Sequence, residues 1–376
     1  MDTTDRPDTP ALAKGLGLGR RQFLAATTGM AAATLAGPLA GRASAASAPA
    51  AASASGVVVP PGKRGIILYT VRDAISRDPA TTPYASGFRA VFEELGRIGY
   101  KQVEFAGYRQ HPNAPGGDTD TVAGAHLLRQ WLDDNGLEAE GNHGSVPGDL
   151  SAGSLAAFDA ACERANILGL GHIGTGGDPT GSAYQADWDA AAERWNVLGR
   201  RAAGHGLKLY THNHDTAYNF LLDSGPLDAQ GRPTRSSGIR RLEYFLTRTD
   251  PAYVFLEMDI YWAHVAQFRF RTYTAPDGST VTSVFNPLAV VQRQPIRFPL
   301  FHAKDGDSRP DLPAGYEMVP FGTGDIDYRT FLSQTGARGY HNPMYEQDNA
   351  PGGAANPGQS LDFSRLSYQN MAALRA

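Results

Sequence analysis

The chain has 376 residues, enough for one large α/β domain of about 250 residues together with insertions. Its 34 basic and 38 acidic residues give a net charge of -4 at pH 7, and no basic run follows the N-terminus, which argues against nucleic acid as a partner. Cys162 is the only cysteine, so the chain cannot form an internal disulfide.

Residues 1–45 have the features of a twin-arginine export signal. Arg20-Arg21 is followed by Phe23-Leu24, by a weakly apolar run, and by Ala-Ser-Ala at 43–45, which is typical of a cleavage site. The apolar run is shorter than the roughly 20 residues that a membrane-spanning helix needs, so we expect no stable membrane anchor. These features predict export to the periplasm or the extracellular space.

Residues 46–62 are mainly Ala, Ser, Pro and Gly and predict a flexible linker, with the folded domain at 63–376. In that domain, β-type and helix-type segments alternate. Strands are predicted at 65–70, 102–105, 137–143, 170–174, 206–212, 252–259, 297–302 and 339–346. Helices are predicted at 84–98, 121–135, 152–168, 184–204, 236–249, 286–293, 325–335 and 360–374.

This alternation of eight strands and eight helices predicts parallel pairing and a closed (β/α)8 TIM barrel. An open, doubly wound sheet is the alternative, but no glycine-rich phosphate loop follows the first strand. Residues 268–284 interrupt the alternation with two short β-type runs around a Pro-Asp-Gly turn. They predict a β-hairpin inserted after the sixth strand, where it would overhang the site as a lid or an oligomer contact.

Polar residues stand at the carboxyl ends of several predicted strands. His212 and His214 are two residues apart at the end of the fifth strand, so their side chains should leave the same face. Asp259, His302 and Glu346 end the next three strands. Nitrogen and oxygen ligands at the tips of successive strands indicate a divalent metal in the mouth of the barrel, with Mn, Co, Zn, Fe and Mg all compatible. We expect Glu257, in contrast, to face the helix layer.

The chain resembles the sugar phosphate isomerase/epimerase group of xylose isomerase-like TIM barrels over roughly residues 64–374. The blocks that carry the resemblance, in the group's order, are Tyr69-Thr70-Val71-Arg72, residues 99–107, His212-Asn213-His214-Asp215, residues 258–262, His302-Ala303-Lys304-Asp305 and residues 322–327. The group includes epimerases, isomerases and dehydratases, so the resemblance indicates the fold and a metal more closely than the reaction.

The resemblance implies one divalent metal held by His212 or His214 together with Asp259, His302 and Glu346. The epimerase branch has a glutamate at the fifth strand, where this chain has a His-Asn-His motif. Those epimerases use two glutamates on opposite faces of the sugar as acid and base. With only one member of that pair present, a symmetric epimerisation by two glutamates is in doubt.

The chemistry that follows is proton abstraction next to a carbonyl, with a metal-stabilised enediolate. Glu346 and His212 are candidates to flank the sugar, and Glu104 and His143, at the ends of the second and third strands, are further acid/base candidates. Lys304 could neutralise developing negative charge. Each of these residues could instead be a hydrogen-bonded or substrate-orienting group at a strand end.

The sequence thus predicts an exported, metal-dependent isomerase, epimerase or lyase for a small, non-phosphorylated carbohydrate, including keto sugars. Two other classes stay open: a phosphodiesterase or endonuclease with the same type of barrel, and a sugar-binding protein without catalysis. The acidic charge argues against the nuclease, which would need a basic surface. Assembly into a homo-oligomer is also open.

Overall fold

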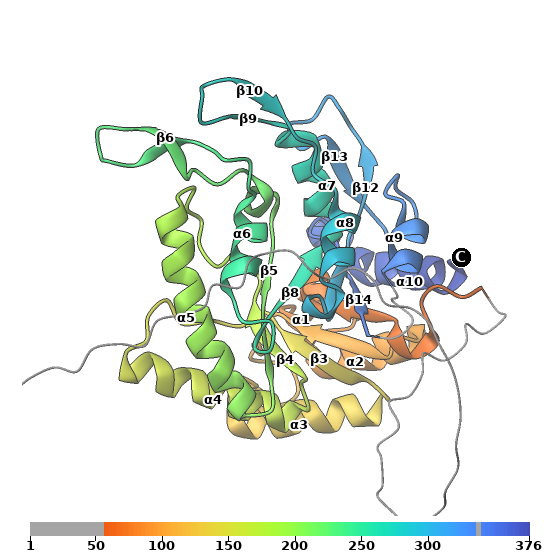
Figure 1. The fold of residues 1–376 in the computed structure, drawn as a ribbon. Coiled ribbons are helices and arrows are strands. Elements are labelled where there is room, and N and C mark those ends of the chain that lie inside the picture. Colours follow the sequence, from red (N-terminus) through yellow and green to blue (C-terminus); the bar gives the residue numbers. More distant parts are fainter. Residues whose placement is uncertain (1–55, 336–339) are drawn as a thin grey trace, which may run out of the picture. The chain divides into compact units, whose positions relative to one another are not determined.

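The computed structural model describes residues 56–335 and 340–376, which form an α/β barrel (Figure 1). The predicted export signal and the first part of the linker lie outside the described residues. The barrel strands are β1 (Gly65–Ile67), β2 (Gln102–Phe105), β3 (Glu138–Asn142), β4 (His172–Thr175), β5 (Lys208–His212), β8 (Val254–Asp259), β11 (Leu300–Ala303) and β14 (Asn342–Tyr345). Within the described part, no helix is long and apolar enough to cross a membrane.

The eight strands run parallel in the order β3-β2-β1-β14-β11-β8-β5-β4. The two end strands approach each other, and a parallel bridge between His143 and Gly174 joins their carboxyl ends. A side chain at Gly174 would lie 2.1 Å from the carbonyl oxygen of Tyr210, so the close strand approach there requires glycine. The predicted (β/α)8 barrel is confirmed, and it is nearly closed.

Helices follow the strands on the outside of the barrel. They are α1 (Arg72–Ile75), α2 (Gly87–Ile98), α3 (Val122–Asp134), α4 (Ala152–Leu168), α5 (Gln185–Gly204), α6 (Arg241–Arg248), α7 (Ile260–Arg269), α8 (Pro287–Arg293), α9 (Tyr328–Gln334) and α10 (Gln359–Ala373). In α2, Phe88, Val91 and Leu95 are buried at helical spacing, and Gly99 ends the helix in a left-handed conformation, with φ of +116°. The spacing of apolar residues therefore decides which face meets the sheet.

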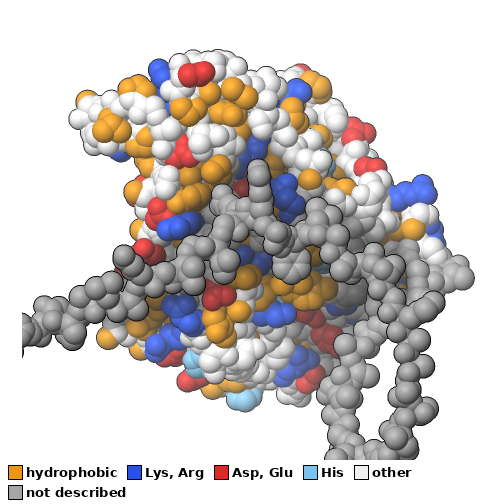
Figure 2. Space-filling model, viewed as in Figure 1, with side chains coloured by type: hydrophobic (Ala, Val, Ile, Leu, Met, Phe, Trp, Pro, Cys, Tyr) orange, Lys and Arg blue, Asp and Glu red, His pale blue; other side chains and the backbone are white. Residues whose placement is uncertain are grey.

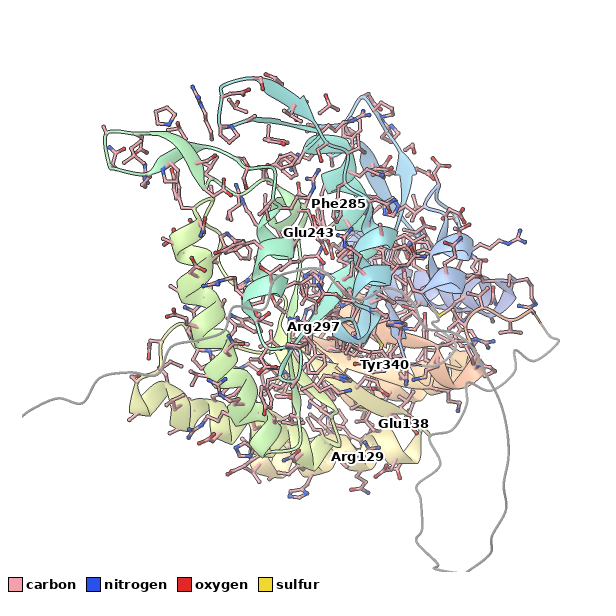
Figure 3. All side chains as sticks on the ribbon, in the orientation of Figure 1. Arg129, Glu138, Glu243, Phe285, Arg297 and Tyr340 are labelled. Atoms are coloured by element: carbon pink, nitrogen blue, oxygen red, sulfur yellow. The ribbon has the colours of Figure 1, made fainter. Side chains whose placement is uncertain are left out.

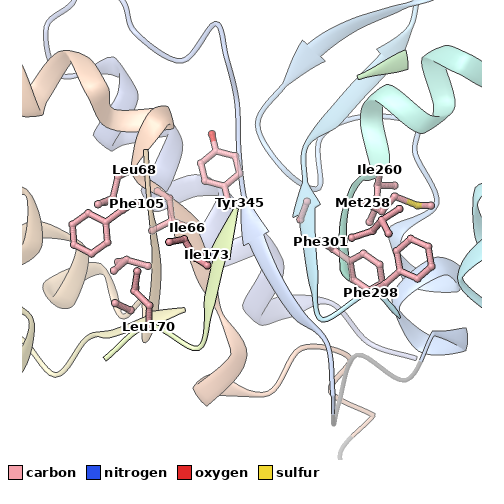
Figure 4. Packing of buried hydrophobic residues seen from close by; sticks show 14 of the residues in the cluster. Ile66, Leu68, Phe105, Leu170, Ile173, Met258, Ile260, Phe298, Phe301 and Tyr345 are labelled. Carbon is pink, nitrogen blue, oxygen red and sulfur yellow. The ribbon is translucent and has the colours of Figure 1, made fainter. Parts of the chain in front are cut away.

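The main apolar core lies between the strands and the helices, where Phe105, Ile66 and Leu68 pack near one another (Figure 4). A second, smaller cluster of Tyr210, Phe255, Leu300 and Met344 comes from four barrel strands. Side chains two residues apart share a face of a strand, so the residues two positions after this cluster also point into the barrel. Those residues are His212, Glu257, His302 and Glu346. The barrel interior is thus apolar in the middle and polar at the carboxyl end.

A buried arginine fixes the start of β8, the strand that carries Glu257 and Asp259. Arg297 (Figure 3) is 1% exposed and donates hydrogen bonds to the carbonyl oxygens of Val254, at 2.8 Å, and Leu246, at 3.1 Å. It also donates to the hydroxyl of Thr249 at 2.7 Å. These bonds tie the end of α6 to β8, so the strand enters the barrel at a defined position.

Three two-stranded hairpins extend beyond the barrel in the described part (Figure 1). They are β6 (Ser224–Leu227) with β7 (Pro233–Arg235), β9 (Thr272–Thr274) with β10 (Thr280–Thr282), and β12 (Asp305–Ser308) with β13 (Tyr316–Val319). The hairpin predicted within 268–284 is confirmed as β9 and β10. It packs against the β6–β7 segment, where the Ser236 amide donates to the Thr274 carbonyl oxygen at 3.0 Å. The other two hairpins were not predicted.

The folded domain begins earlier than the predicted boundary at residue 63. Val58 and Val59 are fully buried, and the Ala376 amide donates to the Gly56 carbonyl oxygen at 2.7 Å. Three consecutive valines at 57–59 supply apolar surface that the Ala- and Ser-rich stretch before them lacks. Residues 56–62 therefore belong to the domain rather than to a linker.

Candidate metal centre

Four predicted ligands converge at the carboxyl end of the barrel. One ligand atom from each of His212, Asp259, His302 and Glu346 lies within 4.8 Å of the others, and all four residues are buried. We call these four residues the metal group. They come from neighbouring strands, because β5, β8, β11 and β14 are adjacent in the sheet and reach the same edge.

The facing atoms of the metal group are buried and lie close to one another. His302 Nδ1 is 2.7 Å from Glu346 Oε2, and His212 Nε2 is 3.4 Å from Asp259 Oδ2. Two carboxylates brought together in a buried site need positive charge beside them, which a cation can supply. Two imidazole nitrogens and two carboxylate oxygens are a ligand set that Zn, Mn, Co or Fe accepts. The residues therefore fit a divalent cation.

Lys304 is the cation nearest to these carboxylates. Its Nζ lies 2.9 Å from Asp259 Oδ2, 2.7 Å from Glu346 Oε2 and 3.1 Å from Asp348 Oδ1. Burial acts to lower the pKa of Lys304, but the three carboxylates outweigh it and raise that pKa. Burial likewise acts to raise the pKa of Asp259 and Glu346, and the nearby positive charges hold both well below their ordinary values. Both carboxylates are therefore ionised and available as ligands.

A second group of acidic and histidine residues supports the first. His143 Nε2 lies 2.7 Å from Glu257 Oε2, and His302 Nε2 lies 3.1 Å from Glu104 Oε2. Tyr210 donates its hydroxyl to the other oxygen of Glu104. We call Glu104, His143 and Glu257 the supporting group. His302 thus directs Nε2 to the supporting group and Nδ1 to the metal group, a relation typical of a metal-binding histidine held by carboxylates.

Burial controls the charges of the supporting group. It lowers the pKa of His143 to about 4 and raises that of Glu257 to about 7. It also raises the pKa of Glu104, and the neighbouring charge of Glu257 adds to the effect. His143 is therefore neutral near pH 7, and its contact with Glu257 favours the tautomer that carries the proton on Nε2.

The expectation that Glu257 faces the helix layer was wrong. Glu257 and Asp259 are two residues apart on β8, which is one full repeat of a strand, so both side chains point into the barrel. Sequence reasoning also did not identify Asp348, which is two residues beyond Glu346 and contacts Lys304. For Glu257, the alternation along β8 was the signal that could have found the residue, whereas Asp348 lies in the turn after β14, which ends at Tyr345.

The structure separates the two histidines of the fifth strand. β5 ends at His212, which lies in the metal group, whereas His214 is exposed and lies outside it. The chain turns after the strand, and a 3-10 helix begins at Asp215, so strand alternation no longer holds at His214. The His214 ring instead packs against the Trp262 ring, with centroids 5.6 Å apart.

A cavity of about 460 Å³ opens onto the metal group. Its lining residues are Tyr69, Ala106, His143, Gly176, His212, His214, Lys304, Glu346 and Asp348. Of the predicted catalytic residues, Glu346, His212, His143 and Lys304 thus line the cavity, while Glu104 is fully buried behind it. The volume falls within the range of about 300–1,000 Å³ that is usual for small-molecule sites.

Comparison with known structures finds the same fold in several proteins. The chain is similar to a sugar phosphate isomerase/epimerase from Parabacteroides distasonis, with 20% identity and a TM-score of 0.56 over 86% of this chain and 96% of that one. A probable 3-DHS dehydratase from Bacillus anthracis is 13% identical, with a TM-score of 0.53 over 82% of this chain and 97% of that one. A xylose isomerase domain protein from Alicyclobacillus acidocaldarius is 15% identical, with a TM-score of 0.52 over 76% of this chain and 93% of that one. At such identities the likeness concerns the fold.

The comparison with curated proteins gives no match. The family model described as Xylose isomerase-like TIM barrel matches residues 92–365. This match spans the strands from β2 to β14, including all four that carry the metal group. The chain therefore belongs to the Xylose isomerase-like TIM barrel family.

Proposed function

We propose that the chain is a divalent-metal-dependent enzyme that removes a proton next to a carbonyl of a carbohydrate, leading to isomerisation, epimerisation or elimination. The observation that carries this proposal is the convergence of four buried ligand atoms, from two histidines and two carboxylates, beside a small-molecule cavity. His212, Asp259, His302 and Glu346 would hold the ion, which can be Mn, Co, Zn, Fe or Mg. When bound, the ion would polarise the sugar oxygens and stabilise the negative charge that develops as the proton leaves.

We propose His143 as the residue that accepts the proton. Its Nε2 is engaged by Glu257 at 2.7 Å, which leaves Nδ1 as the free basic nitrogen. A side chain at Gly176 would lie 2.7 Å from this Nδ1, and Gly176 lines the cavity, so the nitrogen is on the cavity side. A neutral imidazole oriented by a buried carboxylate is a common form of general base.

Lys304 and Glu104 would act differently. Lys304 lines the cavity and carries a fixed positive charge, so it can bind a sugar oxygen on which negative charge grows. Glu104 does not line the cavity, and its contacts are with His302 and Tyr210. We therefore assign Glu104 a positioning role: it holds His302 in the orientation that directs Nδ1 to the metal group.

The substrate we propose is a small, non-phosphorylated carbohydrate, such as a keto sugar. The predicted export signal supports this proposal, because sugar phosphates are scarce outside the cytoplasm, and export by the twin-arginine route is itself part of the proposal. The phosphodiesterase alternative would need further metal ions. Such an enzyme would also need a basic binding surface, and basic and acidic side chains are interspersed on the face in Figure 2. This observation favours the carbohydrate.

Hydrogen exchange at the carbon next to the carbonyl tests the proposal. Keto sugars are incubated with metal-loaded protein in deuterated water, and deuterium incorporation is followed by NMR. We expect exchange with the wild type, and a loss of at least about 100-fold in Glu346→Gln and His302→Ala. His126→Ala, at an exposed position of α3, is the matched control and should behave as the wild type. Unchanged exchange in the two site variants would refute the mechanism, and binding without exchange would indicate a non-catalytic sugar-binding protein.

A further inference from the structure

A second cavity, of about 550 Å³, adjoins the cavity at the metal group. Ala106 lines both cavities, and Gly144 in the wall of the second directly follows His143 in the wall of the first. The second cavity lies between the segments after β2 and β3 and the helix α4. Each cavity by itself has the usual size of a small-molecule site, so the two together can hold a ligand made of two units.

The charged side chains of the second cavity are already paired or lie at its edge. Arg164 donates to Asp120 Oδ1 at 2.7 Å, and Arg109 donates to Asp120 Oδ2 at 3.2 Å. The side chain of Arg109 is 86% exposed, so water solvates its guanidinium group. A charged ligand would have to compete with these partners. The other polar side chains of the lining are neutral.

Asn142, which ends β3, presents a hydrogen-bond donor to the second cavity. Its Oδ1 accepts a hydrogen bond from the Gly107 amide at 3.0 Å, so the other atom of the side-chain amide is the Nδ2 donor. The residue is 5% exposed and lines the cavity, and Nδ2 has no acceptor within residues 56–335 and 340–376. A Cβ atom at Gly144 would lie 2.8 Å from Nδ2, so glycine leaves room for a ligand beside this donor.

Two hydroxyl groups in the lining of the second cavity are also free. Tyr108 is 8% exposed and its ring packs on Phe105, with centroids 5.1 Å apart, but its hydroxyl makes no hydrogen bond within the described part of the chain. Ser145, in the segment after β3, brings a second hydroxyl that is likewise unbonded there. Phe158 and Ile173 supply buried apolar surface in the same lining. The free groups are thus neutral donors and acceptors next to apolar side chains.

This combination suits a sugar better than an aromatic ring. A pyranose carries hydroxyl groups around its edge and C–H groups on its faces. It can therefore bond to the amide and the two hydroxyls while its faces contact the apolar side chains. An aromatic ring would exclude water from the same three polar groups without bonding to them, which is unfavourable.

We propose that the second cavity binds a second sugar unit, so that the substrate is a reducing disaccharide. This proposal rests on the proposed function, because it places the sugar that has the carbonyl at the metal group. In a reducing disaccharide, the glycosidic bond uses the anomeric carbon of the second sugar only, so the first sugar keeps its carbonyl for the removal of a proton. The first sugar would lie next to His143, and the second would bond to Asn142 and Tyr108.

The test compares single sugars with disaccharides that contain the same sugar at the reducing end. Fructose is paired with turanose, maltulose, isomaltulose and lactulose, and glucose is paired with maltose and cellobiose. Each sugar is titrated calorimetrically into the Mn²⁺-loaded protein. We expect at least one disaccharide to bind at least about tenfold more tightly than its single sugar, because the second unit adds two or three neutral hydrogen bonds.

Two substitutions test whether the second cavity causes this preference. Tyr108→Phe removes only the free hydroxyl and should reduce the preference about three- to tenfold. Ala157→Trp, which fills the cavity from an exposed position of α4, should abolish it. The matched controls should keep the preference. They are Tyr253→Phe, directly before β8 at the opposite end of the barrel, and Ala156→Trp, at an exposed position of α4 outside the cavity lining.

The outcomes separate this proposal from the one on which it rests. Equal affinities for every disaccharide and its single sugar, or a preference that survives either substitution, would overturn the second sugar site and leave the site at the metal group intact. Failure of all the sugars to bind would overturn both sites. Because Tyr108→Phe removes no hydrogen bond of the free protein, this variant decides the question if the tryptophan variant does not fold.

Discussion

Replacing Lys304 by methionine should destabilise the metal-free protein much more than the metal-loaded protein. Lys304 Nζ lies 2.9 Å from Asp259 and 2.7 Å from Glu346, two buried carboxylates, and its own side chain is 2% exposed. Removing one partner of a buried ion pair costs about 3–5 kcal/mol, because the other charge is left uncompensated. Asp348, whose side chain is 32% exposed, adds little to this cost.

A bound divalent cation would compensate the same two carboxylates. We therefore expect Lys304→Met to lower the free energy of unfolding by about 3–5 kcal/mol in EDTA and by less than half of that in saturating Mn²⁺. By linkage, the variant should also bind Mn²⁺ more tightly than the wild type, since the competing ammonium is gone. The assay is urea unfolding with and without metal, followed by fluorescence, together with calorimetric titration of Mn²⁺.

Lys208→Met provides the matched control. Lys208 begins β5, at the opposite end of the strand from His212, and its Nζ lies 5.4 Å from the centre of the Phe255 ring. Its replacement should change stability by the same amount in EDTA and in Mn²⁺. If Lys304→Met also destabilises the protein equally in both conditions, or does not destabilise it in EDTA, the reasoning about the two carboxylates is refuted.

Three further predictions concern individual histidines. His212→Ala should weaken Mn²⁺ binding by at least about 100-fold, whereas His214→Ala should change the affinity by no more than about threefold. Calorimetric titration measures both affinities, and the reverse result would make His214 the ligand instead of His212. His143→Gln should reduce deuterium exchange by about 100- to 10,000-fold while the bound metal, measured by mass spectrometry, stays the same; loss of metal would instead make His143 a ligand. Burial lowers the pKa of His172 from 6.5 to about 4, so the folded protein favours the neutral ring. The free energy of unfolding should therefore fall as the pH drops from 6.5 towards 4, because the unfolded chain binds a proton that the folded protein does not. In His172→Asn, this fall should be smaller by about 3 kcal/mol, and an unchanged pH profile of urea unfolding would contradict the prediction.

Much of the fold could be predicted from the sequence because local pattern and global fold agree. The eight apolar runs became the eight barrel strands, and the regular spacing of Phe88, Val91 and Leu95 identified the buried face of α2. Positions at strand ends also predicted that Asp259, His302 and Glu346 would meet, since the carboxyl ends of barrel strands share one edge.

The features of the fold and the site that could not be predicted depend on where each strand ends and on contacts between distant segments. His212 and His214 differ in the structure because β5 ends at His212, and alternation alone does not fix that endpoint. The β6–β7 hairpin was not predicted because its strands are short, exposed and rich in Gly and Pro, so they lack an apolar face. The ion pairs of Lys304 and the link from His143 to Glu257 join strands far apart in the sequence, and the spacing of residues gives no sign of them.

Anomalous diffraction from a crystal soaked in Mn²⁺ tests the central claim most directly. We predict a single strong peak within about 2.0–2.3 Å of His212 Nε2, Asp259 Oδ2, His302 Nδ1 and Glu346 Oε2. A peak among Glu104, His143 and Glu257 instead, or no peak at the carboxyl end of the barrel, would contradict the account.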